Sequence, residues 1–195
     1  MLLIELANID SVYFLEALEA ARAIQNEYFY ASALRELAKL DSVNFSQLLD
    51  AVRSIQDESR RAKVLIELAQ KASADCSLLL DATRSIQNES SRAEVLIELA
   101  NFTPNIFLPE IYQVIIEITH NADRAKALSS YISRLPLASL PYTDWQTYLH
   151  LLAHRERADL MGDLATLYPA ILNLGGEDAG RGMVGEMGRV CKQWN

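Results

Sequence analysis

Two segments of the chain are nearly identical: residues 48–69 read LLDAVRSIQDESRRAKVLIELA, and residues 79–100 read LLDATRSIQNESSRAEVLIELA. They follow each other at a spacing of 31 and share 18 of 22 positions. An earlier copy at 17–38 lies upstream at the same spacing and matches the segment 79–100 at 12 of 22 positions. A fixed period of this length is typical of repeat arrays, in which each copy is one structural unit that stacks on its neighbours.

Weaker copies extend the pattern in both directions. Residues 2–7 (LLIELA) match the end of the later copies, so the chain opens inside a repeat. Residues 118–128 repeat the turn and second helix at a spacing of 32, and residues 154–160 do so another 33 positions on. We therefore predict a helical array over 1–174, with a partial first unit and about five helix pairs, and a C-terminal capping helix over 175–195.

Each repeat reads as two helices joined by a polar turn. Apolar residues from Phe45 to Ile55 lie on one arc of a helical wheel, which predicts a first helix with one buried face. A short polar residue that can cap a second helix then recurs with the period: Asn26, Asp57 and Asn88. A glutamate follows each cap and suits the positive end of the new helix. No strand is expected.

Composition limits the function. The chain has 195 residues, half of them apolar, and a net charge of -8, so it has enough apolar residues for a core and is repelled by nucleic-acid phosphates. No apolar run approaches the roughly 20 residues that span a membrane. The two cysteines, Cys76 and Cys191, have no CxxC partner, and the N-terminus does not resemble a signal peptide. We expect a cytoplasmic protein in which Cys76 is a small core residue.

The turn and the start of the second helix, Asp57–Ala62 and Asn88–Ala93, resemble the short, 31-residue class of HEAT-like repeats, in which an acidic turn precedes an Arg-Ala pair. The resemblance implies an all-α, right-handed α-α solenoid of helix pairs. The block 17–27 and the C-terminal Leu-Gly-Gly-Glu-Asp-Ala segment are similar to repeat arrays of large bacterial signalling proteins. Those arrays often follow STAND-type nucleotide-binding or effector modules, and the resemblance implies a sensor or scaffold.

Arginine recurs at one position inside the apolar arc of the second helix, at Arg61, Arg92, Arg124 and Arg157. A buried guanidinium needs a carboxylate, and each turn supplies one. We expect this set, the arginine ladder, to fix the register between stacked units, with Tyr30 packing by ring contact at the same position of the first copy. The alternative is a basic groove for an acidic peptide. Tyr28 and Phe29 are expected to pack within the first repeat.

Motifs typical of catalysis lack their context. Residues 180–185 match G-x-G-x-x-G, but no strand precedes them. His150 and His154 are four residues apart, but no third metal ligand accompanies them. We therefore expect no enzyme activity, no catalytic residue, no metal and no cofactor.

The function predicted is protein or peptide binding by a non-catalytic scaffold, with no nucleic-acid or membrane partner. Solenoids bind partners along a surface lined by second helices. The polar residues expected on that surface are Arg35, Glu36, Lys63, Glu67, Glu94 and Glu98.

Two alternatives remain open. Chromophore lyases and their accessory subunits also use HEAT-like repeats of this length, which would imply handling of a small ligand. Homotypic assembly through the N-terminal half-repeat is the other. It rests on the expectation that Leu2, Leu3, Leu6 and Phe14 are partly exposed in a monomer.

Overall fold

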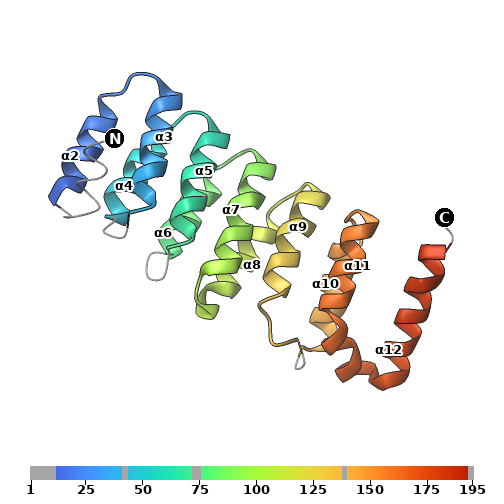
Figure 1. The fold of residues 1–195 in the computed structure, drawn as a ribbon. Coiled ribbons are helices and arrows are strands. Elements are labelled where there is room, and N and C mark those ends of the chain that lie inside the picture. Colours follow the sequence, from blue (N-terminus) through green and yellow to red (C-terminus); the bar gives the residue numbers. More distant parts are fainter. Residues whose placement is uncertain (1–11, 41–43, 72–75, 138–139, 193–195) are drawn as a thin grey trace. The chain divides into compact units, whose positions relative to one another are not determined.

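The computed structural model describes residues 12–40, 44–71, 76–137 and 140–192. Within these ranges the protein is all-helical, with eleven α-helices packed in sequential pairs and one short 3-10 helix (Figure 1). The chain forms two compact units, Met1–Ile118 and Thr119–Asn195. Across the described helices, none is both long and apolar enough to cross a bilayer.

The first unit consists of two rows of helices. One row holds the first helix of each pair: α2 (Val12–Arg22), α4 (Phe45–Arg53), α6 (Cys76–Arg84) and α8 (Leu108–Ile116), with the 3-10 helix η1 (Asn105–Phe107) before α8. The other row holds the second helices: α3 (Glu27–Ala38), α5 (Glu58–Ala69) and α7 (Glu89–Phe102). Within the second-helix row α3 packs on α5 and α5 on α7, so most contacts join neighbours, as in a helical array (Figure 1).

The core of the first unit lies between the two rows. Leu48, Leu49 and Val52 of α4 are almost completely buried, as are Leu65 and Leu68 of α5. Each such side chain contributes about 1.5–3 kcal/mol relative to exposure. These positions recur with the period of the repeat, so each unit buries the same stripe against the next. Cys76 is fully buried at the start of α6, as predicted, and burial raises the pKa of its thiol to about 11.

The predicted N-caps are confirmed. The side-chain oxygen of Asn26 accepts a hydrogen bond from the Tyr28 backbone N–H at 3.0 Å. Asp57 caps α5 and Asn88 caps α7 in the same way, at 3.0 and 2.8 Å. Each cap satisfies a backbone donor that the first turn of a helix leaves free.

The glutamates after the first two caps bind the next repeat. Glu27 Oε1 accepts hydrogen bonds from the backbone N–H groups of Gln56 and Asp57, at 2.6 and 2.8 Å. The Glu58 carboxylate accepts the same two bonds one repeat later, from Gln87 and Asn88, at 3.0 and 2.7 Å. We call this arrangement the carboxylate clamp. It joins the start of one second helix to the turn that begins the following one.

Arg61 and Arg92 of the arginine ladder lie beside the clamp, and their side chains are 15% and 13% exposed. Arg61 pairs with Glu58 at 3.2 Å and donates to the Ile55 carbonyl, and Arg92 pairs with Glu89 at 3.5 Å and donates to the Ile86 carbonyl. Both therefore bind their own helix turn. Arg61 also donates a long hydrogen bond, at 3.5 Å, to the Ser85 carbonyl of the next repeat.

Tyr30 occupies the ladder position of the first repeat and acts through its hydroxyl. It donates to the Ala51 carbonyl at 3.0 Å and lies 3.1 Å from the Ser54 hydroxyl. The expectation that Tyr30 packs by ring contact alone was therefore wrong, because its hydroxyl binds polar groups at the end of α4.

The second unit comprises α9 (Asn121–Ile132), α10 (Tyr142–Leu152), α11 (Arg157–Thr166) and α12 (Tyr168–Lys192). In α12 the helix kinks at Gly176, whose φ of 67° is strained for residues with a side chain. Gly180 then packs closely, since an added Cβ would lie 2.8 Å from Leu172. This kink is close to residue 174, where the sequence predicts that the repeat array ends and the capping helix begins. That domain boundary remains a prediction.

The arginine ladder changes in the second unit. Arg124 occupies the fourth position of α9, as Arg61 and Arg92 do in their helices, and donates to the Asn121 side chain at 2.5 Å. Arg157 is exposed, so its placement in a buried ladder was wrong. The reason is a shift of the helix start: α11 begins at Arg157 itself, which puts that side chain in the first turn.

The second unit also contains a buried ion pair that the repeat pattern does not predict. Arg155 Nε lies 2.8 Å from Asp163 Oδ2, and Ser129 donates a hydrogen bond to the same carboxylate. Asp163 is 6% exposed, and burial raises its pKa while Ser129 and Arg155 act in the opposite direction. The cluster joins α9, the α10–α11 turn and α11.

The expectation that Phe14 is partly exposed was wrong, because Phe14 is only 1% exposed. Phe14, Ala17, Leu18 and Ala21 form one buried stripe of α2, because α2 packs on α3. Leu2, Leu3 and Leu6 lie outside the described residues.

Glu58→Gln tests the carboxylate clamp. We expect a loss of about 1 kcal/mol at neutral pH, since hydrogen bonds to a charged group are replaced by bonds to a neutral one. The backbone N–H groups of Gln87 and Asn88 lower the pKa of Glu58 from 4.5, so its stabilising effect is complete above that pH and is lost as the pH falls through the folded-state pKa. Urea unfolding across this range should show the two proteins converging in acid. A difference that persists there contradicts the clamp, and exposed Glu94→Gln is the control.

Arg92→Ala tests the ladder. The mutant loses hydrogen bonds to the Ile86 carbonyl and to Glu89 in a poorly solvated position, so we expect a loss of about 2 kcal/mol. Arg53→Ala breaks an exposed pair with Asp50 and should lose less than about 1 kcal/mol. Denaturant unfolding measures both. Equal losses would show that burial adds nothing to the ladder.

Candidate functional site

The six residues predicted for a binding surface all lie on the second helices of the first unit. Arg35 and Glu36 belong to α3, Lys63 and Glu67 to α5, and Glu94 and Glu98 to α7. Two of them pair across repeats, because Arg35 Nε donates to Glu67 Oε1 at 2.8 Å. Glu36 instead pairs at 2.7 Å with Lys39, the C-cap residue that follows α3. The structure thus joins α3 to α5 through these side chains.

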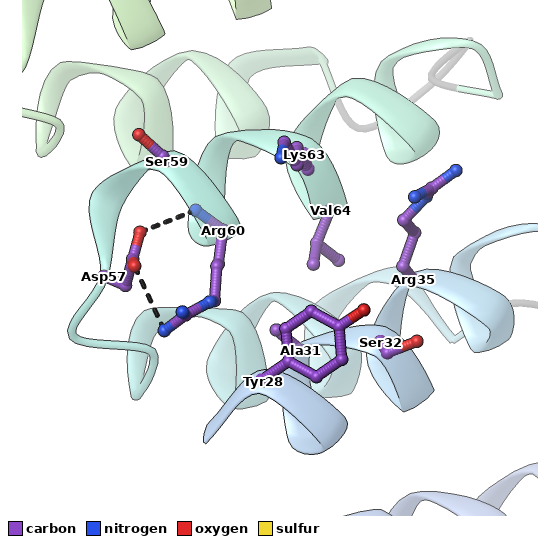
Figure 2. Close-up of a pocket in the computed structure, with 9 residues that line it drawn as sticks. All are labelled: Tyr28, Ala31, Ser32, Arg35, Asp57, Ser59, Arg60, Lys63 and Val64. Carbon is purple, nitrogen blue, oxygen red and sulfur yellow. Dashed lines mark hydrogen bonds and ion pairs between the residues drawn. The ribbon is translucent and has the colours of Figure 1, made fainter. Parts of the chain in front are cut away.

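A groove of about 370 Å³ lies between α3 and α5 (Figure 2). Tyr28 and Arg60 lie at one end and Arg35 lies toward the other, with Lys63 on the α5 side (Figure 2). The complete lining is Tyr28, Ala31, Ser32, Arg35, Asp57, Ser59, Arg60, Lys63 and Val64. The groove combines an apolar surface with three cations.

Tyr28 and Arg60 form the aromatic end of the groove. The Arg60 guanidinium lies 5.9 Å from the centre of the Tyr28 ring, within the range of a cation–π contact. Arg60 also pairs with Asp57 at 3.0 Å, an interaction drawn in Figure 2. The Tyr28 ring meets Phe29 edge-on at 5.3 Å. Together these contacts hold a planar ring and a planar cation at the same opening.

Tyr28 and Phe29 are 61% and 59% exposed, so the expectation that they pack within the first repeat was wrong. Their place in the repeat explains this result. Tyr28 corresponds to Ser59 and Ser90, and all three are exposed near the start of a second helix. Comparing equivalent positions would have identified the surface, because a large ring stands where the other copies have serine.

The contact between α5 and α7 is different at the equivalent place. There the hydroxyl groups of Ser59 and Ser91 lie 3.4 Å apart, where Tyr28 and Arg60 stand between α3 and α5. Small side chains allow a direct contact, whereas the ring and the guanidinium line an open groove. The aromatic end of the groove therefore depends on two differences between the repeats, Tyr28 in place of Ser59 and Arg60 in place of Ser91.

The electrostatics of the groove are opposite to those of the whole chain. Its lining holds Arg35, Arg60 and Lys63, of which Arg35 pairs with Glu67 and Arg60 with Asp57, so these five side chains carry one net positive charge, whereas the whole chain carries a net charge of -8. The hydrogen bond and charge of Glu67 raise the pKa of Arg35 further. Lys63 is exposed and makes no ion pair within the described residues. The groove can therefore bind an anionic group through charge and an apolar group through Tyr28, Ala31 and Val64.

Other motifs from the sequence do not contribute to this groove. His150 and His154 stand with ring centres 6.3 Å apart, and the described part of the chain contains no group of three or more metal-ligating side chains. Gly180–Gly185 lies inside α12.

The chain matches no protein-family model, no curated protein and no solved structure.

Surface residues of the groove should matter little for stability. We expect Tyr28→Ser, which installs the serine of the equivalent positions, and Lys63→Ala each to change the unfolding free energy by roughly 0.5 kcal/mol or less. Leu65→Ala at a fully buried position should lose about 2–5 kcal/mol. Urea unfolding compares the three. A loss above about 2 kcal/mol for either groove mutant would assign its side chain to the core.

Proposed function

We propose that the protein is a non-catalytic scaffold or sensor segment that binds a protein or peptide on its second-helix face. The groove between α3 and α5 carries this proposal. It brings an exposed aromatic ring, two arginines and a lysine to one open site between repeats. Aromatic and arginine side chains are the residue types that contribute most to protein interfaces.

The fold proposed for this role is a right-handed solenoid of HEAT-like pairs. Three observations support it: the 31-residue period, the row of α3, α5 and α7, and the carboxylate clamp that recurs at Glu27 and Glu58. Such arrays keep their core positions constant and vary the exposed side chains of one helix row. The difference between Tyr28 and its serine equivalents fits that division.

The chemistry of the groove favours recognition of charge. Guanidinium groups stay protonated at neutral pH, so Arg35 and Arg60 are suited to holding anions rather than to transferring protons. The net charge of -8 opposes the long phosphate backbone of a nucleic acid while leaving a short acidic group attractive locally. A protein segment with a carboxylate meets both conditions.

Selection from a random displayed peptide library tests the proposal. Peptides enriched on the wild-type protein should bind it in solution, as measured by fluorescence anisotropy. Ser32 is exposed and lines the groove, so Ser32→Trp fills the site and should weaken the enriched peptides by at least about tenfold. Ser46→Trp adds the same ring at an exposed position of α4, in the other row, and should leave binding unchanged.

Two results would overturn the proposal. One is the absence of any enriched peptide that binds the wild-type protein. The other is equal affinity for wild type and Ser32→Trp, which would place the binding surface outside the groove.

A further inference from the structure

One position of the second-helix row changes its charge from one repeat to the next, from neutral through positive to negative. Ser32, Lys63 and Glu94 occupy one repeat position on α3, α5 and α7, and all three are exposed. The α3–α5 groove has a cationic lining, whereas α7 presents the carboxylates of Glu94 and Glu98. Because these two glutamates are four residues apart, they lie on the same face of α7.

The charged side chains of the groove and those of α7 form no ion pairs with each other within the described residues. Within the described ranges the side chains of Lys63, Glu94 and Glu98 take part in no ion pair or hydrogen bond, whereas Glu67 of α5 pairs with Arg35. Lys63 and Glu94 are exposed, and Glu98 is half-buried. An exposed charge of this kind contributes little to folding and is available to a partner.

We infer that the ligand is an extended peptide segment of mixed charge, with an acidic side chain over the α3–α5 groove and a basic side chain over α7. This inference rests on the proposed function and adds the chemical class of the partner. Charge complementarity at both ends gives specificity, because a uniformly acidic peptide would be repelled by α7 and a uniformly basic one by the groove.

The spacing of the two charges follows from the packing. Lys63 of the groove and Glu94 of α7 belong to the neighbouring packed helices α5 and α7, and such helices lie about 8–10 Å apart. A peptide in the polyproline II conformation advances about 3.1 Å per residue and presents every third side chain on the same face. The acidic and basic side chains of the ligand should therefore be about three residues apart. The geometry sets no preference between the two directions of the peptide chain.

The test uses the same peptide library on wild type and on Glu94→Lys/Glu98→Lys, which makes the α7 face basic. Wild type should enrich peptides with an acidic and a basic residue about three positions apart. The double mutant should enrich peptides that are acidic at both positions. A wild-type peptide should lose affinity for the double mutant by at least about tenfold and regain it when its basic residue is changed to glutamate.

Glu16→Lys/Glu110→Lys is the matched control. It makes the same charge change at exposed positions of α2 and α8, in the first-helix row, and should alter affinity less than about twofold once salt is raised to screen long-range effects. Circular dichroism checks the folding of each variant. Should the lysine pair prevent folding, Glu94→Gln/Glu98→Gln replaces it, and selection on that variant should lose the basic residue.

The outcomes separate the two claims. Peptides that Ser32→Trp blocks but that show no mixed charge, or that bind the double mutant as well as wild type, overturn this inference and leave the proposed function standing. An absence of groove-dependent peptides overturns both. Mixed-charge peptides with the expected spacing and the expected charge reversal support both.

Discussion

One carboxylate at each junction holds the consecutive second helices α3, α5 and α7 in register. Glu58 accepts two backbone N–H groups from the turn that starts the next second helix, and Glu27 does the same one repeat earlier. Both donors belong to the main chain, so the interaction does not depend on which side chain occupies the turn. Hydrophobic burial is non-directional and tolerates sliding, whereas paired hydrogen bonds to a charged group fix a position.

Packing contacts and variable side chains therefore occupy different parts of each second helix. The clamp, the N-cap and the buried leucines use the start and the inner face of each second helix, leaving its outer face unconstrained. The outer face is where the repeats differ most, as Tyr28 against Ser59 and Lys63 against Glu94 show. A regular array therefore presents an irregular surface, and the groove is a local property of one pair of repeats.

Local features were predictable from the sequence, and features made by stacking were not. The cap at Asp57 depends on a backbone group one helical turn away, so the pattern alone identified it. The partners of Glu58 belong to the following repeat, and they become neighbours only when repeats pack. Arg157 was placed wrongly because α11 begins at Arg157 itself, which is later in the repeat than the alignment implies. The groove at Tyr28 and Arg60 needed both helices in place, although Arg35 and Lys63 in its lining were surface candidates from the sequence.

The repeating unit also affects how such a chain can change over generations. Each clamp joins only consecutive units through main-chain groups, so duplication or loss of a whole unit leaves an intact clamp at the new junction. The segments 48–69 and 79–100, identical at 18 of 22 positions, belong to two such units. Gaining one unit between α5 and α7 would lengthen the distance between the basic and acidic faces by one helix width. Copy number, rather than point mutation, would then adjust this distance.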